Sequence, residues 1–332
     1  MSEDATEVGR IGRQANRRIG ATGWLLFLFV IVLVVTLALN GPEGAMDAIS
    51  RVGISGLLVL MGLVCVHYVI RAIRWHVLVR VGGVDTGFLQ NTRHFLGGFA
   101  MTATPGRVGE LVRLRWLKLE TGHRFGTLVP IAFADRALEL AAMVVVIAGA
   151  LAFASLGTTS TIWLLLVGFG VVALCSPQLL SRGIGLLWLA IGRRAPRIFA
   201  KLRRMARSLA LFTVPKVLLP IIAIGALGWL MEGIAFWLVL DWLEIPLPLP
   251  TATAIFLCAI LSGALLGLPG GLGGVEGGAV LLLVLQGVPA DTALLATVII
   301  RLTTLWFAVL VGFVVFPYAE YRAVRAEPGD VT

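Results

Sequence analysis

The sequence predicts an all-α polytopic membrane protein with about six full spans and two re-entrant helical hairpins, or eight spans if the hairpins are counted. Hydrophobic residues make up 58% of the 332 residues and charged residues only 14%, whereas soluble domains carry about 25% charged residues. Several apolar runs reach the length of a membrane span. Lys and Arg cluster between these runs, as in the loops of membrane proteins.

The predicted spans are long apolar stretches bounded by charged or turn-forming residues. They cover about 21–39, 52–70, part of 125–154, 162–175, 217–240 and 292–316. Residues 1–20 and 318–332 are polar tails, so we expect one transmembrane domain over residues 21–317. The uncharged stretch after the first tail is longer than a signal-peptide core of about 7–15 residues, which indicates a retained span.

Two further apolar segments are interrupted by proline and glycine. One is Phe88–Thr104, which ends at Pro105-Gly106. The other is Thr251–Leu268, which ends at Pro269-Gly270-Gly271 and is followed by Gly277–Leu285. Irregular backbone at membrane depth is tolerated only where protein or a water-filled cavity surrounds it. We therefore predict a re-entrant hairpin in each segment.

The distribution of basic residues predicts the orientation. The N-terminal tail, the stretches 71–124 and 182–216, and the C-terminal tail are rich in Lys and Arg, whereas residues 241–300 contain neither. Because basic loops concentrate on the cytoplasmic side, we expect a multi-pass protein of the cytoplasmic (inner) membrane with both termini in the cytoplasm. The first hairpin should then enter from the cytoplasm and the second from outside.

A similar order of residues recurs in the two broken segments. The first contains Pro105, Gly106, Gly109, Glu110 and, 31 residues after the proline, Arg136. The second contains Pro269, Gly270, Gly273, Glu276 and, 32 residues after the proline, Arg301. This favours an internal repeat of opposite orientation, about 52–154 and 217–316, over chance agreement between glycine-rich segments. Inverted repeats with broken helices are typical of alternating-access transporters.

Nine ionisable residues in or beside these segments are candidate substrate-binding residues: Arg107, Glu110, Arg113, Asp135, Arg136, Glu139, Glu232, Glu276 and Arg301. A charged side chain at the centre of a bilayer costs about 2.5–3.5 kcal/mol, so such residues usually face a partner or a cavity. We expect Glu110 to pair with Arg136 and Glu276 with Arg301. The pairs could be structural salt bridges, or the arginines could bind a lipid phosphate in a bidentate fork. The carboxylates could instead receive a cationic headgroup or a coupling proton.

The glycines and a basic linker have simpler interpretations. The turns at Pro105, Gly106, Gly109, Pro269, Gly270 and Gly273 either only connect half-helices or also direct backbone N–H groups at an anion. The glycine spacing after Gly263 favours close helix packing. Residues 193–210 are basic and amphipathic, which predicts a surface helix on anionic lipid that links the repeats, together with span 162–175.

Other functional classes find little support in the sequence. The net charge of +9 comes with no nucleic-acid-binding motif, so we expect no nucleic-acid partner. The three cysteines lie in apolar runs and the four histidines are scattered, so we expect neither a metal site nor a cofactor.

The motifs resemble the transmembrane region of lysyl-phosphatidylglycerol synthases, a flippase-like family. The matching stretches are Arg71-Ala-Ile-Arg74-Trp75, Thr104-Pro-Gly-Arg-Val-Gly-Glu110-Leu-Val-Arg113, Asp135-Arg-Ala-Leu-Glu139, Pro269-Gly-Gly-Leu-Gly-Gly-Val-Glu276 and Arg301-Leu-Thr-Thr-Leu-Trp306. The resemblance implies a protein that flips lysyl-phosphatidylglycerol or moves polyprenyl-linked sugars. The usual Glu-Arg-x-x-Asp appears here as Asp135-Arg136-x-x-Glu139, with the carboxylates exchanged, which leaves the substrate open.

These observations favour a lipid transporter over two alternatives. The expected substrate is an anionic phospholipid or a polyprenyl-phosphate-linked lipid, moved by alternating access. The soluble aminoacyl-transfer domain of the bifunctional synthases is not present in this sequence, so we do not expect an enzyme. The alternatives are an intramembrane lipid-modifying transferase that uses Asp135 or Glu139 as a base, and a scaffold subunit without transport. The protein partners considered are further copies of this chain and envelope-synthesis enzymes.

Overall fold

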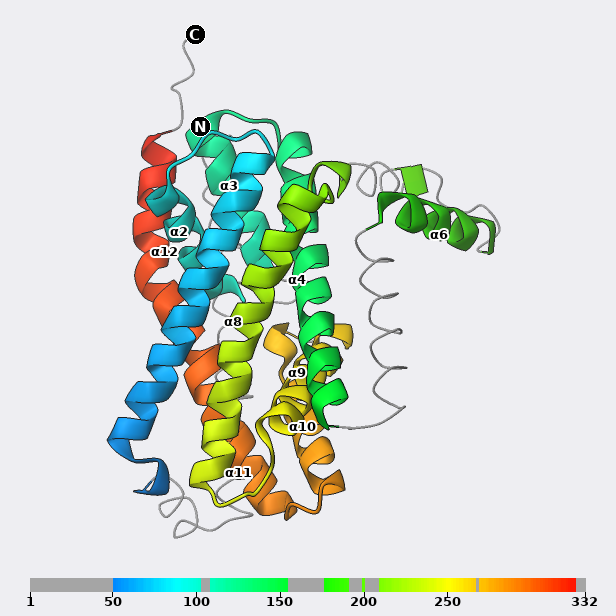
Figure 1. Ribbon diagram of the computed structural model, residues 1–332. Helices are drawn as coiled ribbons and strands as arrows, with labels where there is room; N and C mark the ends of the chain where they lie inside the picture. The colour runs from blue at the N-terminus through cyan, green and yellow to red at the C-terminus, as the bar shows by residue number, and fades with distance from the viewer. Residues whose placement is uncertain are drawn as a thin grey trace, which may run out of the picture.

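A computed structural model describes residues 50–102, 108–154, 176–190, 199–200, 209–266 and 269–326. Within these ranges the regular elements are helices, and four helices are long and apolar enough to cross a membrane. They are Ser50–Val81, α4 (Phe125–Ala154), α8 (Pro215–Trp242) and the continuous stretch Ala290–Arg325. These helices run lengthwise through the molecule (Figure 1), which confirms the predicted membrane class.

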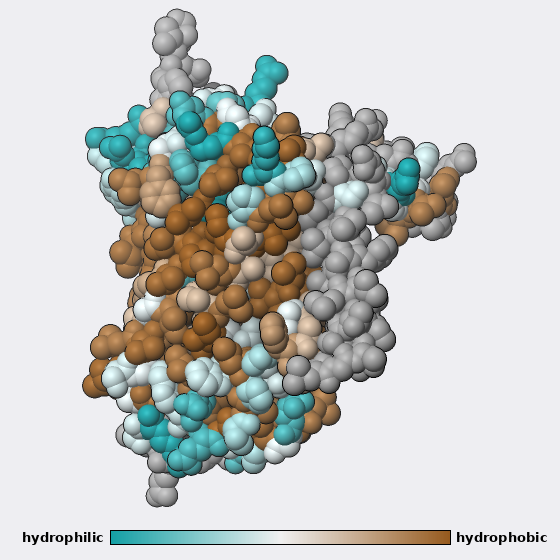
Figure 2. Space-filling model, viewed as in Figure 1, coloured by the Kyte–Doolittle hydropathy of each residue, from teal (hydrophilic) through white to brown (hydrophobic). Residues whose placement is uncertain are grey.

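The surface of the bundle has the polarity of a membrane protein. Figure 2 shows an apolar zone between two more polar ends. Large apolar side chains are exposed in this zone, for example Ile54 at 80% and Leu58 at 64%. Such exposure suits hydrocarbon as the solvent, since lipid replaces the protein neighbours that a soluble fold would need.

Four of the six predicted spans correspond to these long helices. The predicted span 52–70 lies in the helix Ser50–Val81, which continues past Ile70. Arg71 and Arg74 do not end this helix, because they find partners on its buried face. The last predicted span consists of α11 (Ala290–Arg301), the π-helical turn η4 (Leu302–Trp306) and α12 (Phe307–Arg325). The predicted spans 21–39 and 162–175 lie outside the described residues.

The first broken segment folds as a hairpin. It comprises α2 (Phe88–Gly97), the 3₁₀ turn η1 (Gly98–Met101) and α3 (Val108–Thr121). Its tip lies against α12, where a Cβ added to Gly312 would come within 2.1 Å of the Ala100 backbone nitrogen. A glycine is therefore needed for this close approach of two backbones.

The second broken segment is also a hairpin. It comprises α9 (Leu249–Leu265), the turn η3 (Pro269–Gly271) and α10 (Gly274–Leu285). A Cβ on Gly274 would lie 2.9 Å from the Gly263 Cα, so α9 and α10 cross at these two glycines, as their spacing predicted. Gly270 and Gly273 have φ values of 61° and 81°, which other residues adopt with strain.

The two hairpins enter the bundle from opposite ends. In Figure 1, α2 and α3 lie in the upper half and α9 and α10 in the lower half. Each hairpin follows one long helix and precedes another, so the order helix, hairpin, helix occurs twice with opposite direction. This arrangement agrees with the predicted inverted repeat.

The linker between the two repeats contains elements that the sequence did not predict. Helix α6 (Pro177–Ala190) lies to one side of the bundle in Figure 1, and η2 (Leu209–Leu211) precedes α8. Leu186, Leu187 and Leu189 of α6 are more than half exposed. Most of the predicted amphipathic segment 193–210 lies outside the described residues.

Candidate functional site: a buried arginine and carboxylate cluster

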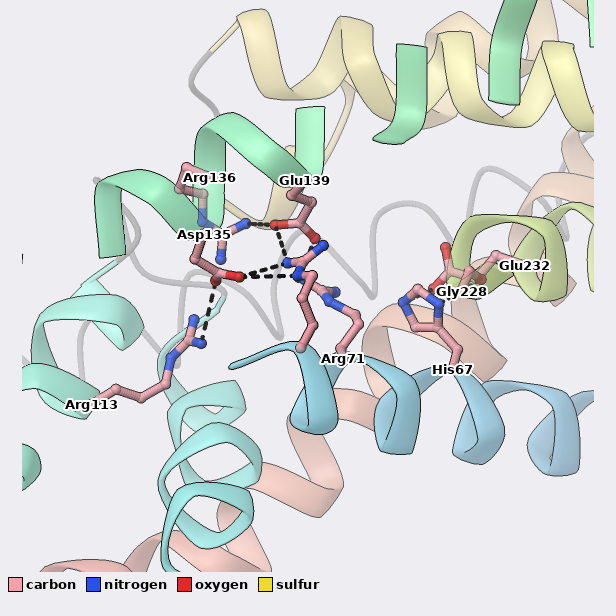
Figure 3. A network of polar contacts seen from close by, with 9 residues as sticks. His67, Arg71, Arg113, Asp135, Arg136, Glu139, Gly228 and Glu232 are labelled. Carbon is pink, nitrogen blue, oxygen red and sulfur yellow. Dashed lines mark hydrogen bonds and ion pairs between the residues drawn. The ribbon is translucent and has the colours of Figure 1, made fainter. Parts of the chain in front are cut away.

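One face of the helix Ser50–Val81 carries three functional side chains. His67, Arg71 and Arg74 follow one another at intervals of four and three residues, a spacing that places them on the same side of an α-helix. This face is directed at α4, where Asp135 and Glu139 share a face for the same reason (Figure 3). Two membrane-length helices thus bring opposite charges together.

Arg74 and Asp135 form the inner pair of the cluster. Arg74 Nε and Nη2 donate to Asp135 Oδ1 at 3.1 and 2.7 Å. Each of the two residues is only 1% exposed. A pair so deeply removed from water holds α4 against the first helix, because either ion alone would be left uncompensated.

Glu139 is the acceptor that most of the cluster shares. Arg71 Nη2 contacts its Oε1, and Arg136 Nη1 donates to its Oε2 at 2.5 Å. Arg74 Nη2 lies 3.5 Å from the same Oε2 atom. Glu139 therefore forms ion pairs with three guanidinium groups, two of which, Arg71 and Arg136, are partly exposed at 17% and 26%.

The first hairpin contributes Arg113 to the same cluster. Its Nη1 lies 3.9 Å from Asp135 Oδ2, and its guanidinium carbon lies 5.0 Å from the ring centres of both Trp75 and Phe95. Two aromatic faces stabilise a guanidinium through cation–π contact, which fixes Arg113 beside the inner pair. A movement of the hairpin would therefore move a charge at the site.

Arg71 lies between two aromatic rings and has one donor that is not used within the cluster. Its guanidinium lies 5.5 Å from the Phe95 ring and 5.9 Å from the Trp229 ring. Its Nε is buried without a hydrogen-bond partner in the described part of the chain. A buried N–H donor with no acceptor is costly, and an anion that supplied an oxygen there would relieve that cost.

A histidine and a carboxylate adjoin the cluster on the side of α8. His67 Nδ1 lies 2.7 Å from the Gly228 carbonyl oxygen, and His67 Nε2 lies 3.3 Å from Glu232 Oε1. Both residues are buried, at 1% and 7% exposure. Figure 3 shows Arg71 between this pair and Glu139.

A second, separate network stabilises the other hairpin. Arg301 Nε donates to Glu276 Oε1 at 2.6 Å, and Arg301 Nη2 donates to the Gly270 carbonyl at 2.8 Å. The other Glu276 oxygen accepts from the Gly273 N–H at 2.7 Å, at the start of α10. The network joins η3, α10 and the end of α11, directly before the π-helical turn η4, a feature that is frequent at functional sites.

The structure places the predicted site residues in three groups. Arg113, Asp135, Arg136 and Glu139 belong to the first cluster, and Glu276 and Arg301 form the predicted pair in the second. Glu232 contacts His67 and is close enough to interact electrostatically with Arg71 and Glu139 of the first cluster and with Arg301 of the second. The side chains of Arg107 and Glu110 and the turn at Pro105-Gly106 lie outside the described residues, and with them the predicted pairing of Glu110 with Arg136. The substrate-binding role of all these residues stays a prediction.

Three residues of the site were not among the sequence-predicted candidates: His67, Arg71 and Arg74. Arg71 and Arg74 appeared as the basic flank of a span that seemed to end at Ile70 and as part of a motif of the family resemblance, but not as candidate site residues. Their spacing of three residues could have identified them as site residues, because the largely apolar stretch from Trp75 to Val81 continues the helix beyond them. His67 gave no such signal, because one histidine in an apolar run is more often a hydrogen-bonded core residue.

Comparison with known proteins supports the assignment of these motifs. Residues 21–312 match the sequence model of the family described as lysylphosphatidylglycerol synthase TM region. The chain belongs to this family. A UPF0104 membrane protein from Methanothermobacter thermautotrophicus is similar to it, at 23% identity over 318 residues, which cover 89% of this chain and 94% of the relative. Both networks lie inside the region that the lysylphosphatidylglycerol synthase TM family matches, so the resemblance inferred from the sequence motifs is confirmed.

Proposed function

We propose that this protein is a lipid transporter, or flippase, that moves a phospholipid or a polyprenyl-linked lipid across the cytoplasmic membrane. The observation that carries the proposal is the cluster in which Arg71, Arg74, Arg113 and Arg136 converge on Asp135 and Glu139. Among the described residues, four guanidinium groups there meet two carboxylates. Guanidinium groups in a water-poor site recognise phosphate oxygens well, because they present a planar fork of donors.

The cluster divides into a fixed part and an exchangeable part. The Arg74–Asp135 pair is almost fully buried and supplies a rigid base. Glu139 is held mainly by two arginines that are partly exposed, so a lipid phosphate could take its place on Arg71 and Arg136. The carboxylate thus keeps the arginines satisfied when no lipid is bound, which avoids uncompensated charge inside the bundle.

The inverted hairpins supply a route for alternating access. Arg113 of the first hairpin contributes to the cluster, and Glu276 and Arg301 hold the second hairpin. Rocking of one repeat against the other would open the site to each side in turn, as in other inverted-repeat transporters. Arg93 and Arg115 of the first hairpin, together with Arg325 at the end of the adjacent helix α12, support a cytoplasmic location of this end of the bundle.

The transferase alternative fits the site less well. A general base needs a free lone pair within reach of the substrate proton. Asp135 is 1% exposed and accepts from Arg74, and Glu139 is held by Arg71 and Arg136. Arginines therefore occupy oxygens of both carboxylates that a substrate would have to reach, so transport is the better-supported proposal.

Reconstituted transport tests the proposal. The full-length protein in liposomes should carry a fluorescent phosphatidylglycerol between leaflets, measured by the fraction that an external reductant can bleach. We expect Arg71→Ala to lower the initial rate about tenfold or more, since one charged hydrogen bond contributes about 1.5–3 kcal/mol. Arg71→Lys should retain part of the rate, because the charge remains while the planar fork is lost.

A matched control uses an arginine of the same helix outside the cluster. Arg80 is half exposed and pairs with Asp85 near the end of the helix, so Arg80→Ala should keep the wild-type rate. Equal rates for wild type, Arg71→Ala and Arg136→Ala would refute the proposed role of the cluster. A rate no higher than in protein-free liposomes would favour the scaffold alternative.

A further inference from the structure

The His67–Glu232 contact has hydrogen-bonding chemistry that requires a proton. A backbone carbonyl only accepts, so the His67 Nδ1 that lies 2.7 Å from the Gly228 oxygen must carry the hydrogen. In the neutral imidazole, Nε2 is then a bare acceptor. That atom lies 3.3 Å from Glu232 Oε1, which in the ionised carboxylate is an acceptor as well. Two lone pairs would face each other in a buried site.

One added proton removes this conflict. It makes either an imidazolium beside a carboxylate or a neutral imidazole beside a carboxylic acid, and both forms contain the same number of hydrogens. In the present geometry His67 Nε2 is buried and has no hydrogen-bond partner in the described part of the chain. A small rotation of the Glu232 side chain would complete the bond once the proton is present.

The groups around the pair make its proton occupancy sensitive to the arginine cluster. Those that interact electrostatically with His67 or Glu232 are Arg71 and Arg74 on the first helix, Glu139 on α4 and Arg301 on α11. Tyr68, on the same helix as His67, donates its hydroxyl hydrogen to the Thr304 carbonyl at 2.8 Å. Cys65 is exposed on that helix. Arg71 lies one helical turn from His67, so this cation is next to the His67–Glu232 pair and is also part of the arginine cluster.

We propose that His67 and Glu232 form a proton-binding site whose occupancy is coupled to the binding of an anionic lipid headgroup by the arginine cluster. This inference rests on the proposed function and names the ion that would couple to transport. Glu139 already offsets the charge of Arg71 when no lipid is bound, so a phosphate on Arg71 adds negative charge beside the pair, and the pair takes up one proton from water. When the lipid leaves, the proton returns to water, and no covalent bond changes.

The coupling has a defined direction and upper limit. Because proton binding and headgroup binding are linked equilibria, each raises the affinity for the other by the same factor. Uptake of one proton per headgroup raises the affinity for the lipid as the pH falls, by at most about tenfold per pH unit. Glu232→Gln should remove this dependence, since its amide can donate to His67 Nε2 at every pH.

The first experiment measures lipid binding as a function of pH. Short-chain phosphatidylglycerol competes with a fluorescent analogue for the full-length protein in phosphatidylcholine nanodiscs, and its phosphodiester keeps one charge throughout about pH 5–9. We expect the affinity of the wild type to rise as the pH falls and the affinity of Glu232→Gln to stay constant. Glu244→Gln is the matched control, because Glu244 has an 80% exposed side chain that pairs with Arg51 at the bundle end, and it should behave as the wild type.

The second experiment observes the pair directly. The chain has four histidines, so a ¹⁵N-histidine-labelled sample in lipid gives few ring signals, and His67→Gln assigns those of His67. We expect Nδ1 to remain protonated while the Nε2 signal shifts with pH and on addition of phosphatidylglycerol. The shift on lipid addition should vanish in Glu232→Gln and persist in Glu244→Gln.

The outcomes separate this inference from the proposed function. Binding of phosphatidylglycerol with the same affinity at every pH would overturn the proton coupling and leave the transporter proposal standing. A His67 Nε2 signal that is constant across the pH range would overturn the proton site even if binding varied with pH. Absence of phosphatidylglycerol binding at all pH values would overturn phospholipid transport as the proposed function and this inference together.

Discussion

The Arg74–Asp135 pair allows a quantitative test of what the buried charges contribute to stability. Two charged hydrogen bonds join the partners, and both residues are 1% exposed. Removing one partner leaves the other as a buried, uncompensated ion, which costs about 3–5 kcal/mol. We therefore expect Arg74→Met and Asp135→Leu each to lower the free energy of unfolding by about that amount.

The double variant should be far less damaging than the two single variants together. Replacing a buried pair by apolar residues of similar volume is often neutral or stabilising by about 1–4 kcal/mol. In Arg74→Met/Asp135→Leu, Glu139 loses a contact of 3.5 Å but keeps Arg71 and Arg136. Arg113 loses a contact of 3.9 Å with Asp135 but keeps its two aromatic neighbours. The expected coupling energy is therefore at least about 3 kcal/mol. The effects of mutations at independent sites are additive within about 0.5 kcal/mol, so this value is well above that limit.

The measurement is a double-mutant cycle of equilibrium unfolding. Denaturing detergent is titrated into mixed micelles, and the loss of helix is followed by circular dichroism. The control cycle uses Arg51 and Glu244, whose side chains are 40% and 80% exposed, and it should give about 0–1 kcal/mol. Additive effects of Arg74→Met and Asp135→Leu would refute the reasoning, because the two ions would then not depend on each other.

Three further predictions concern the close contacts of the two hairpins and the π-helical turn. Gly312→Ala forces a Cβ into the backbone of the first hairpin and should cost about 1–3 kcal/mol of stability, measured as a lower melting temperature. Gly149→Ala is the control, because a Cβ there enters open space and should leave the melting temperature unchanged. Tyr68→Phe removes the hydrogen bond to the Thr304 carbonyl and should cost about 1 kcal/mol in the same melting assay; an unchanged midpoint would contradict that bond. Glu276→Ala leaves Arg301 Nε and the N–H of Gly273, the residue before α10, without their acceptor and should expose the hairpin to proteolysis. Glu276→Gln should protect the hairpin better, and equal cleavage of both variants would argue against this network.

Much of the architecture was predictable because hydropathy and helix-breaking residues act locally. Four apolar runs of span length became membrane-length helices, and Pro269-Gly270 fell at the turn of the second hairpin. The Glu276–Arg301 pair could also be anticipated, since a repeated spacing within one repeat places both residues near the same turn. The end of the second span could not be predicted, because whether the helix continues through Arg71 and Arg74 depends on partners elsewhere in the chain.

The sequence by itself determined that the protein resides in a bilayer, where its helices break and which charges must find partners there. Only the tertiary structure decided which partners they find. Asp135 follows Arg74 by 61 positions and Gly228 follows His67 by 161, so these contacts depend on how each helix is rotated and where it crosses its neighbour. Rotation and crossing arise from packing of side chains along whole helices, which no local pattern encodes.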